Sequence, residues 1–359
     1  MPSFHGVHHK KSSTPTDFSL MGSDIDGEAA GDFSGFSVSI SSDGTIVAIG
    51  ADNNDGNGTN SGHVRIYEWN SGSSSWDKKG SDIDGEAVSD NSGVSVSLSS
   101  DGTIVAIGAN GNDGNGTSAG HVRIYEWNSG SSSWDKKGSD IDGEAASDYS
   151  GFSVSLSSDG TIVAIGAYGN DDNGSISGHV RVYKWNGSAW AKRGNDIDGE
   201  AAYDYSGRSV SLSSDGTIVA IGAYANDGNG TSAGHVRIYE WNSGSSSWDK
   251  KGSDIDGEAA ADYSGQSVSI SSDGTIVAIG ANGNDGNGTS AGHVRIYEWN
   301  SGSSSWDKKG SDIDGEAVSD NSGVSVSLSS DGTIVAIGAY ANDGNGTSAG
   351  HVRIYEWNS

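Results

Sequence analysis

Short runs of alternating apolar and polar residues recur along the chain at a fixed spacing. Residues 36–41 (FSVSIS) alternate bulky apolar residues with serines, which predicts a strand with one bulky and one small face. Residues 45–51 (TIVAIGA) are apolar on both faces, as in a central strand covered on both sides. Residues 63–69 (HVRIYEW) alternate again, and residues 76–80 are a charged stretch typical of an edge strand. No segment has helical periodicity, so four antiparallel strands are predicted.

The chain copies this four-strand unit six times. The DIDGE signature begins at Asp24 and returns after 58, 58, 56, 58 and 58 residues. The shorter third copy lacks two residues between Trp185 and Trp190, in a predicted loop, where a deletion leaves the strand faces unchanged. Such a repeat indicates one supersecondary unit that buries its apolar face against its neighbours. The copies start near residues 23, 81, 139, 195, 253 and 311.

The two ends of the chain predict how the units are arranged. The sixth copy stops at Ser359, before its fourth strand, whereas residues 18–22 align without a gap with residues 76–80. Phe18 then takes the place of Trp76. A ring divides one unit between its termini in this way, and a linear array has no reason to do so. We therefore predict an all-β fold, a six-bladed β-propeller of four-stranded antiparallel blades closed by an N-terminal strand that completes the last blade.

A solenoid or a different number of blades is the alternative. In either case residues 17–359 are expected to form a single domain, and residues 1–16, which hold three histidines, a flexible tail or expression remnant.

The charge balance excludes some partners. The chain has 20 Lys and Arg against 48 Asp and Glu, a net charge of −28, which argues against nucleic acid and anionic membranes as partners. Without cysteine it has neither disulfides nor thiolate metal sites. The first sixteen residues contain no apolar segment long enough for a signal peptide or an anchor, so direct membrane insertion is not expected.

Residues 150–183, SGFSVSLSSDGTIVAIGAYGNDDNGSISGHVRVY, resemble FG-GAP repeats, the units of integrin α-subunit propellers and of many extracellular proteins. The first glycine of that repeat matches Gly151, and the Gly-Ala of "GAP" matches Gly166 and Ala167. The Phe of "FG" is Ser150 here, and the Pro of "GAP" is Tyr168. The resemblance implies a propeller with a recognition or adhesion role at an extracellular or cell-surface location.

A calcium site is a second expectation. The family's calcium loop between the first two strands is reduced here to residues 42–44 (SDG), so we look for oxygen ligands elsewhere. Carboxylates gather in the loops after the second and fourth strands, which share one rim, and Ca²⁺ takes six to eight oxygen ligands on a flexible backbone. The alternative is that these side chains cap backbone amides in solvated turns. The candidate ligands are Asp24, Asp26, Glu28, Asp32, Asp52, Asp55, Asp82, Asp84, Glu86, Asp90 and Asp113.

The six copies differ mainly at three positions on or beside the same rim, and these carry the ligand-binding hypothesis. Aromatic and amide side chains around an acidic rim suit recognition of sugars or protein loops, although neutral drift at exposed loops gives the same pattern. The candidate ligand-binding residues are Phe33, Phe36, Asn91, Asn110, Tyr149, Tyr168, Tyr205, Arg208, Tyr224, Tyr263, Gln266 and Tyr340.

Together these features predict a non-catalytic extracellular or cell-surface recognition or adhesion propeller. It would bind glycan or a surface protein through repeated acidic rim loops, assisted by calcium, with strength that comes from valency. Six equivalent copies argue against an enzyme, because a catalytic centre breaks a propeller's symmetry. The alternative is a structural repeat scaffold, recently duplicated or consensus-engineered, with no small ligand.

Overall fold

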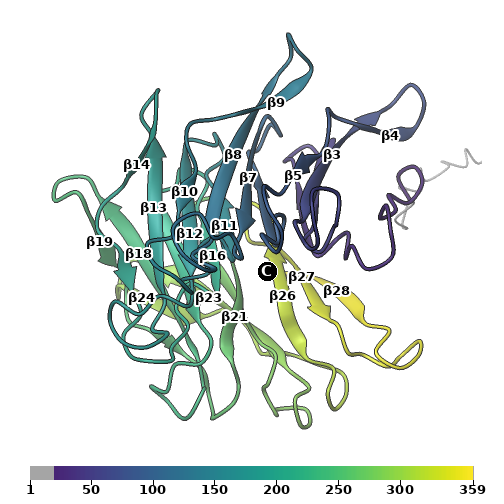
Figure 1. The fold of residues 1–359 in the computed structure, drawn as a ribbon. Helices are drawn as coiled ribbons and strands as arrows, with labels where there is room; N and C mark the ends of the chain where they lie inside the picture. The colour runs from purple at the N-terminus through teal and green to yellow at the C-terminus, as the bar shows by residue number, and fades with distance from the viewer. Residues whose placement is uncertain (1–19, 359) are drawn as a thin grey trace, which may run out of the picture.

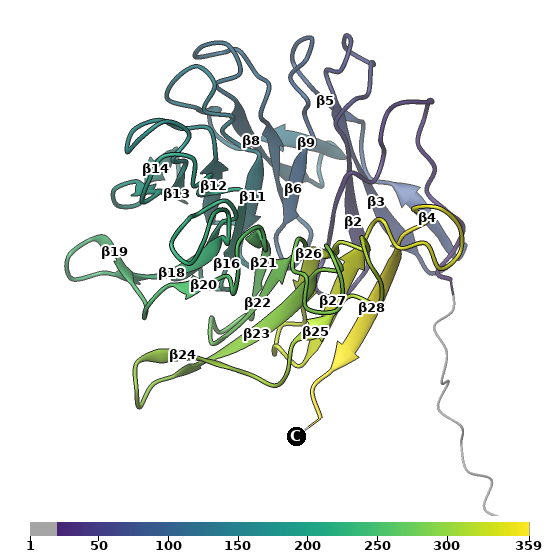
Figure 2. The ribbon, with the colours of Figure 1, turned by 90° about the horizontal axis from the view of Figure 1, so that it is seen from below.

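The computed structural model describes residues 20–358, which form a six-bladed β-propeller of antiparallel sheets (Figures 1 and 2). Equivalent residues of all six sheets meet around one central channel. The described residues contain no helix, and hence none able to cross a membrane.

The blades use the strands that the hydrophobic pattern predicted, in the order in which they occur in the chain, except that the last blade has no fourth strand within the described residues. The innermost strands are β1 (Ser37–Ile40), β6 (Ser95–Leu98), β11 (Ser153–Leu156), β16 (Ser209–Leu212), β21 (Ser264–Ile270) and β26 (Ser322–Leu328). The second strands are β2 (Ile46–Ala51), β7 (Ile104–Ala109), β12 (Ile162–Ala167), β17 (Ile218–Ala223), β22 (Ile276–Ala281) and β27 (Ile334–Ala339). The third strands are β3 (His63–Asn70), β8 (His121–Asn128), β13 (His179–Trp185), β18 (His235–Asn242), β23 (His293–Asn300) and β28 (His351–Glu356).

The outer edge of a blade is built from two short pieces. The fourth strands are β4 (Ser75–Lys78), β9 (Ser133–Lys136), β14 (Trp190–Lys192), β19 (Ser247–Lys250) and β24 (Ser305–Lys308). A further two-residue strand follows each of them: β5 (Ile83–Asp84), β10 (Ile141–Asp142), β15 (Ile197–Asp198), β20 (Ile255–Asp256) and β25 (Ile313–Asp314). In the first blade β5 pairs with the beginning of β3, Val64 opposite Ile83. The sequence pattern missed this strand, because one isoleucine cannot show alternation.

The core lies between consecutive blades. Ile46 and Ile66 of the first blade pack with Leu98 and Ile107 of the second, and four further clusters of the same kind follow around the ring. A sheet in this position is buried on both faces, which explains why the second strands are apolar throughout.

Serine and glycine bring neighbouring blades close together. Ser37 Oγ on β1 donates a 2.7 Å hydrogen bond to the carbonyl oxygen of Gly93 in the next blade, and the same bond recurs at the four following blade junctions. A Cβ atom at Gly50 would collide with that carbonyl. Gly93 itself has φ +91°, a conformation that glycine adopts without strain. The small face of the first strand and the glycine of "GAP" therefore serve blade-to-blade contact.

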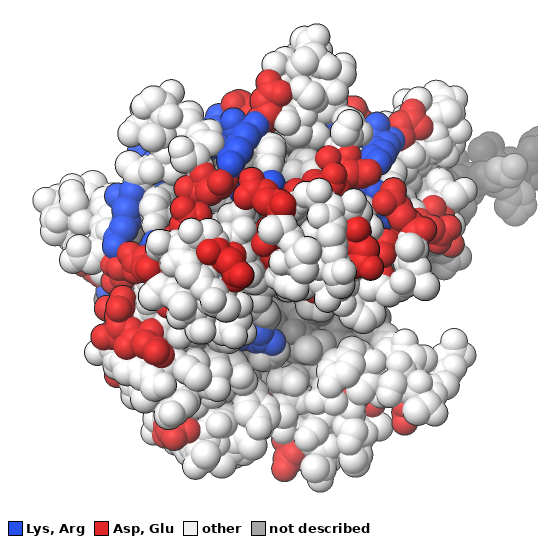
Figure 3. Space-filling view, in the orientation of Figure 1, with Lys and Arg blue, Asp and Glu red and all other residues white. Residues whose placement is uncertain are grey.

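The junction between the last and first blades differs from the other five. Val38 and Ile40 on β1 are 64% and 59% exposed, whereas the equivalent Val96 and Leu98 are buried. On β28, Ile354 is 59% exposed. Figure 1 shows the yellow last blade apart from the purple first blade, and Figure 3 shows a hollow in this region. Residues 20–358 therefore leave a seam, and the last blade has three strands within this range.

A cavity of about 160 Å³ lies against β28, lined by Ile296, Ile313, Val335, Tyr355 and Trp357 among others. In earlier blades a tryptophan of the fourth strand packs at this place against the core between two blades: Trp134, Trp190, Trp248 and Trp306. The cavity is thus the place of an aromatic side chain that the last blade lacks within the described residues.

The N-terminal residues at the seam lie against the first blade. Trp76 Nε1 donates to the carbonyl oxygen of Met21 at 2.8 Å, as Trp134 Nε1 does to that of Lys79 one blade later. Residues 20–22 form no strand with β28, however, and Phe18 lies outside the described residues. Closure by an N-terminal strand therefore stays a prediction. So do the boundaries of the single domain at 17–359 and of the tail at 1–16, which lies outside the described range.

Histidines are buried at the start of the third strands. His63, His121, His179, His235 and His293 are at most 2% exposed. Desolvation by burial, followed by the positive charge of Arg123, lowers the pKa of His121 from 6.5 to about 4. This imidazole is therefore neutral at pH 7 in the folded protein.

Deleting residues 17–22 is expected to lower the melting temperature by at least ~5 °C or to cause oligomerisation, because β28 keeps a bare edge and the aromatic cavity stays empty. Calorimetry and light scattering measure both effects. Deleting residues 1–16 is the control and should change neither. Phe18→Trp should add about 1 kcal/mol, since its indole can donate to the Lys309 carbonyl as Trp306 does to that of Lys251. Unchanged melting of the 17–22 deletion would contradict ring closure.

Stability is expected to fall as the pH drops from about 6.5 to 4. Over this range His121 binds a proton in the unfolded chain, with a pKa of 6.5, but not in the folded protein, with a pKa of about 4. The protonation of the unfolded chain costs the folded state about 2 kcal/mol at pH 5 from this residue alone. Urea unfolding at pH 7 and pH 5 should therefore show a smaller pH-dependent loss in His121→Gln than in the wild type. Equal losses in the two proteins would refute the assignment.

Candidate recognition site at one mouth of the channel

The innermost strands line the central channel and give it two different mouths. At the end of these strands, six serines surround a cavity of about 210 Å³: Ser42, Ser100, Ser158, Ser214, Ser272 and Ser330. The opposite mouth is formed by the residues that precede the innermost strands and by the loops that follow the second strands. Most sequence differences between the copies fall at this second mouth.

Five tyrosines form a continuous row there, across the third, fourth and fifth blades. Tyr149 stacks on Tyr168 with ring centroids 5.3 Å apart and an angle of 6° between the ring planes. The row then continues at 6.1, 5.3 and 5.9 Å through Tyr205, Tyr224 and Tyr263. Burial raises the pKa of Tyr168 and of Tyr224, so both phenols stay protonated and can donate hydrogen bonds. We call Tyr149, Tyr168, Tyr205, Tyr224 and Tyr263 the tyrosine row.

The backbone does not favour tyrosine at three of these positions. Tyr149, Tyr205 and Tyr263 have φ of 53°, 56° and 57°, in the left-handed region. Asn91 and Asn321 have φ of 54° and 55° at the same position of other copies, and asparagine tolerates this region better. A tyrosine there costs roughly 1 kcal/mol of strain. Phe33 has φ of 54° at the same position of the first copy, so the backbone conformation itself does not select tyrosine at these three positions.

Phe152 and Arg208 join the row from the position just before the innermost strand. The Phe152 ring meets Tyr168 edge to face at 4.8 Å, and the Arg208 guanidinium lies over Phe152, 4.1 Å from its centroid. Sequence reasoning selected Arg208 and the tyrosines but did not select Phe152. The contrast with Val94 and Val324 at the same position of the second and sixth copies was the signal that could have found it.

The other candidate ligand-binding residues do not join the row. Phe33, Phe36 and Tyr340 are exposed on the blades that flank the seam. The side-chain amide of Asn91 donates to the carbonyl oxygen of Asp52. Asn110 and Gln266 are half-buried and make none of the aromatic contacts that define the row.

Many of the acidic candidates hold the rim loops together. Asp32 Oδ2 accepts hydrogen bonds from the Ala29 amide and from Asn54 Nδ2, which joins the two loops of the rim. Asp90 makes the equivalent contacts in the second blade. Asp55 and Asp113 each accept a backbone amide five residues later. Asp52 is buried, and desolvation raises its pKa.

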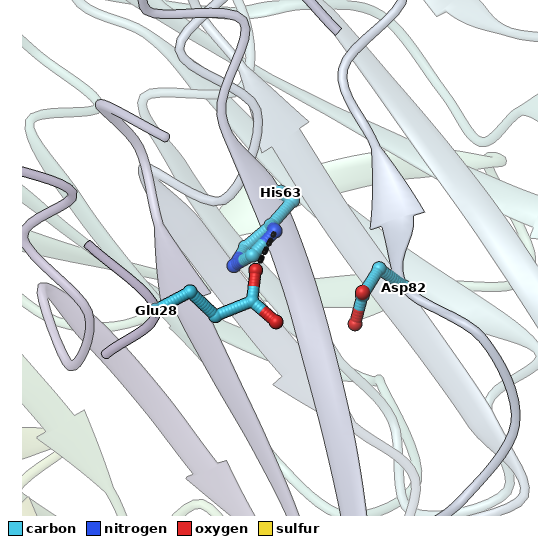
Figure 4. Close-up of side chains that lie close together, drawn as sticks. All are labelled: Glu28, His63 and Asp82. Atoms are coloured by element: carbon cyan, nitrogen blue, oxygen red, sulfur yellow. Dashed lines mark ion pairs between the residues drawn. The ribbon is translucent and has the colours of Figure 1, made fainter. Parts of the chain in front are cut away.

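A second set of acidic candidates surrounds the buried histidines. Glu28, His63 and Asp82 place their donor atoms within 4.8 Å of one another (Figure 4), and the next four copies repeat this Glu–His–Asp group. Each group could hold a metal ion. Cations already lie beside the carboxylates, however: Arg65 Nη1 is 3.8 Å from Glu28, and Lys78 Nζ is 2.5 Å from Asp82.

Calcium fits these groups poorly. It prefers oxygen ligands only, whereas each Glu–His–Asp group offers an imidazole nitrogen and two carboxylates that face basic side chains. The loop where the family binds calcium does not fit either, since Asp43 there accepts hydrogen bonds from Ser41 and Thr45. The carboxylates of Asp24, Asp26 and Asp84 form no ion pair within residues 20–358.

Comparisons with solved structures agree with the fold. A candidate 6-phosphogluconolactonase from Bacteroides uniformis aligns with a TM-score of 0.60 at 10% identity, over 90% of this chain and 81% of that one. The periplasmic gluconolactonase of Pseudomonas aeruginosa aligns with a TM-score of 0.51 at 14% identity, over 77% of this chain and 69% of that one. At these identities the likeness concerns the fold alone. A search of curated proteins found no match.

The sequence comparison identifies the repeat. The FG-GAP repeat matches residues 24–67, 140–183, 197–239 and 254–297. These matches begin at or within one residue of the DIDGE signature and end in the third strand. The second and sixth copies lie outside the matches and have the same sequence pattern. With six such units arranged as blades, this chain belongs to the FG-GAP repeat β-propeller family.

Proposed function

We propose that this propeller is a non-catalytic recognition module that binds a glycan at the tyrosine row. The observation that carries the proposal is the row itself, five rings in contact across three blades at one mouth of the channel. Aromatic faces pack against the apolar faces of sugar rings, and the protonated phenols can donate to hydroxyl groups.

Two further parts of this proposal come from the sequence. The family resemblance favours an extracellular or cell-surface location, where glycans are exposed. The near identity of the copies outside the variable positions favours a binding module over an enzyme, because no copy holds a distinctive nucleophile and base. The two lactonase-like structures share only the fold with this chain.

The repeat scaffold without a ligand is the competing function, and one observation favours it. The buried carboxylates of the rim satisfy backbone amides in every blade, as a purely structural role requires. The tyrosine row favours the recognition function over the scaffold function, because packing of a scaffold gives no reason for tyrosine at positions where asparagine fits the backbone better.

Calcium assistance is a subsidiary part of the proposal. Exposed Asp24, Asp26 and Asp84 remain as oxygen donors on the rim, and a net charge of −28 attracts divalent cations to it.

The double variant Tyr168→Asn/Tyr224→Asn should lose glycan affinity by about tenfold or more on a glycan array and in calorimetry. Both positions carry asparagine in other copies, Asn110 and Asn282, so the variant should fold normally. Tyr203→Ala is the matched control, since Tyr203 is exposed but lies outside the row. Absence of any glycan hit for the wild type would favour the scaffold function instead.

Millimolar calcium added after chelation should raise the melting temperature by about 2 °C or more if calcium binds the folded rim. The triple variant Asp24→Asn/Asp26→Asn/Asp84→Asn should reduce this rise, and magnesium is the control for unspecific screening. A flat response to calcium would remove calcium from the proposal and leave the tyrosine row untouched.

A further inference from the structure

Arg208 breaks the six-fold pattern at the channel mouth. The residue just before the innermost strand is Phe36, Val94, Phe152, Arg208, Gln266 and Val324 in the six copies. Arg208 is the only charged member of this set. Because the same backbone accepts phenylalanine, valine and glutamine, folding does not require a guanidinium at this place.

The guanidinium lies within the aromatic site rather than beside a carboxylate. Its carbon is 4.1 Å from the Phe152 centroid, 5.7 Å from that of Tyr168 and 5.8 Å from that of Tyr224. No ion pair to Arg208 and no hydrogen bond from its side chain occurs within residues 20–358. Its N–H groups, five in a fixed planar fork, are therefore available to a ligand.

All other arginines in the described range have protein partners. Arg65 donates to the carbonyl oxygen of Asp26 and lies 3.8 Å from Glu28, and five arginines of other copies repeat the bond to a carbonyl. Arg193 donates to the carbonyl oxygen of Gly216 and packs over Trp241. Arg208 is thus unlike the structural arginines of this chain in its surroundings as well as in its position.

A half-buried guanidinium without a counter-ion is costly, and aromatic faces offset only part of that cost. Burial lowers the pKa of Arg208 for the same reason. In a chain with a net charge of −28, acidic side chains are abundant, yet none within residues 20–358 pairs with Arg208. An anionic group of a ligand would complete the site, because a carboxylate or sulfate can accept two parallel N–H bonds from the fork.

We propose that the tyrosine row binds an acidic saccharide, with Arg208 binding the carboxylate of a uronic acid or the sulfate of a sulfated sugar. This inference rests on the proposed glycan function and names its ligand class. The sugar ring packs on the tyrosines while its acid group reaches the guanidinium.

The surrounding charge sets the size of the ligand. Figure 3 shows Asp and Glu over much of one face and basic atoms in its central hollow. Carboxylates on the rim repel a long polyanion within a Debye length of about 8 Å at physiological salt. A short oligosaccharide with a single acid group avoids this repulsion, so the inference concerns such ligands rather than highly charged polymers.

Calorimetry of the full chain in 0.15 M NaCl tests the inference with three disaccharides of one hexose: neutral, carboxylated at C6 and sulfated at C6. The wild type should bind at least one acidic form about tenfold or more tightly than the neutral one. Arg208→Gln, which installs the residue of the fifth copy, should abolish this preference, so that the acidic and neutral forms bind with equal affinity. Arg193→Lys is the matched control, since four other copies carry lysine there, and should keep the preference.

Which acidic form binds identifies the acid group. Equal affinity of the wild type for all three sugars, or an acid preference that survives in Arg208→Gln, would overturn the inference but not the glycan function. If the wild type binds none of the three sugars, both the glycan function and the inference are refuted. An acidic peptide that binds as tightly as the acidic sugar would show recognition of charge alone and would also overturn the inference.

Discussion

Face-to-face packing of neighbouring sheets is the contact on which this molecule depends. A single blade has no core of its own, because its second strand is apolar on both faces and both faces need a partner. The contact is close as well as apolar. Serine hydroxyls of one innermost strand bond to the backbone of the next blade, and the glycine of the second strand leaves room for that backbone. These requirements are the same at each of the five junctions within the described residues, which explains why the serines and glycines at these contacts recur from copy to copy.

Because the fold depends on packing between neighbouring blades, the seam between the last and first blades matters for its stability. The last blade exposes Ile354 and the first blade exposes Val38, although the equivalent residues of the other copies lie in or against the apolar core of each other junction. The cavity beside Tyr355 has the position that a tryptophan fills elsewhere, and Met21 already accepts the bond that links successive units. Apolar surface of this kind is unfavourable in water, so closure of the seam would be favoured by its burial.

Comparison of the six copies separates residues that serve folding, which recur in every blade, from residues that differ between blades. The acidic loops recur in all six copies, and Asp32 and Asp55 and their copies satisfy backbone amides that would otherwise lack partners. The tyrosine row and Arg208 occupy three blades, at positions that vary among the six copies. Folding explains the first set of residues, and the proposed recognition function rests on the second set.

The sequence by itself determined the strands, the six units and the family, because strand alternation and repeat spacing are local properties of the chain. It also identified Tyr168, Tyr224 and Arg208 as variable positions on one rim. Only the tertiary structure decided that these side chains touch one another and that Phe152 joins them, since their contacts cross blade junctions. It alone brought five of the six strand histidines together with a glutamate and an aspartate from different loops, and placed arginine and lysine beside these carboxylates. The short strands such as β5 and the open seam likewise could not be predicted from the sequence. They depend on contacts between residues far apart in the chain, which a local sequence pattern does not show.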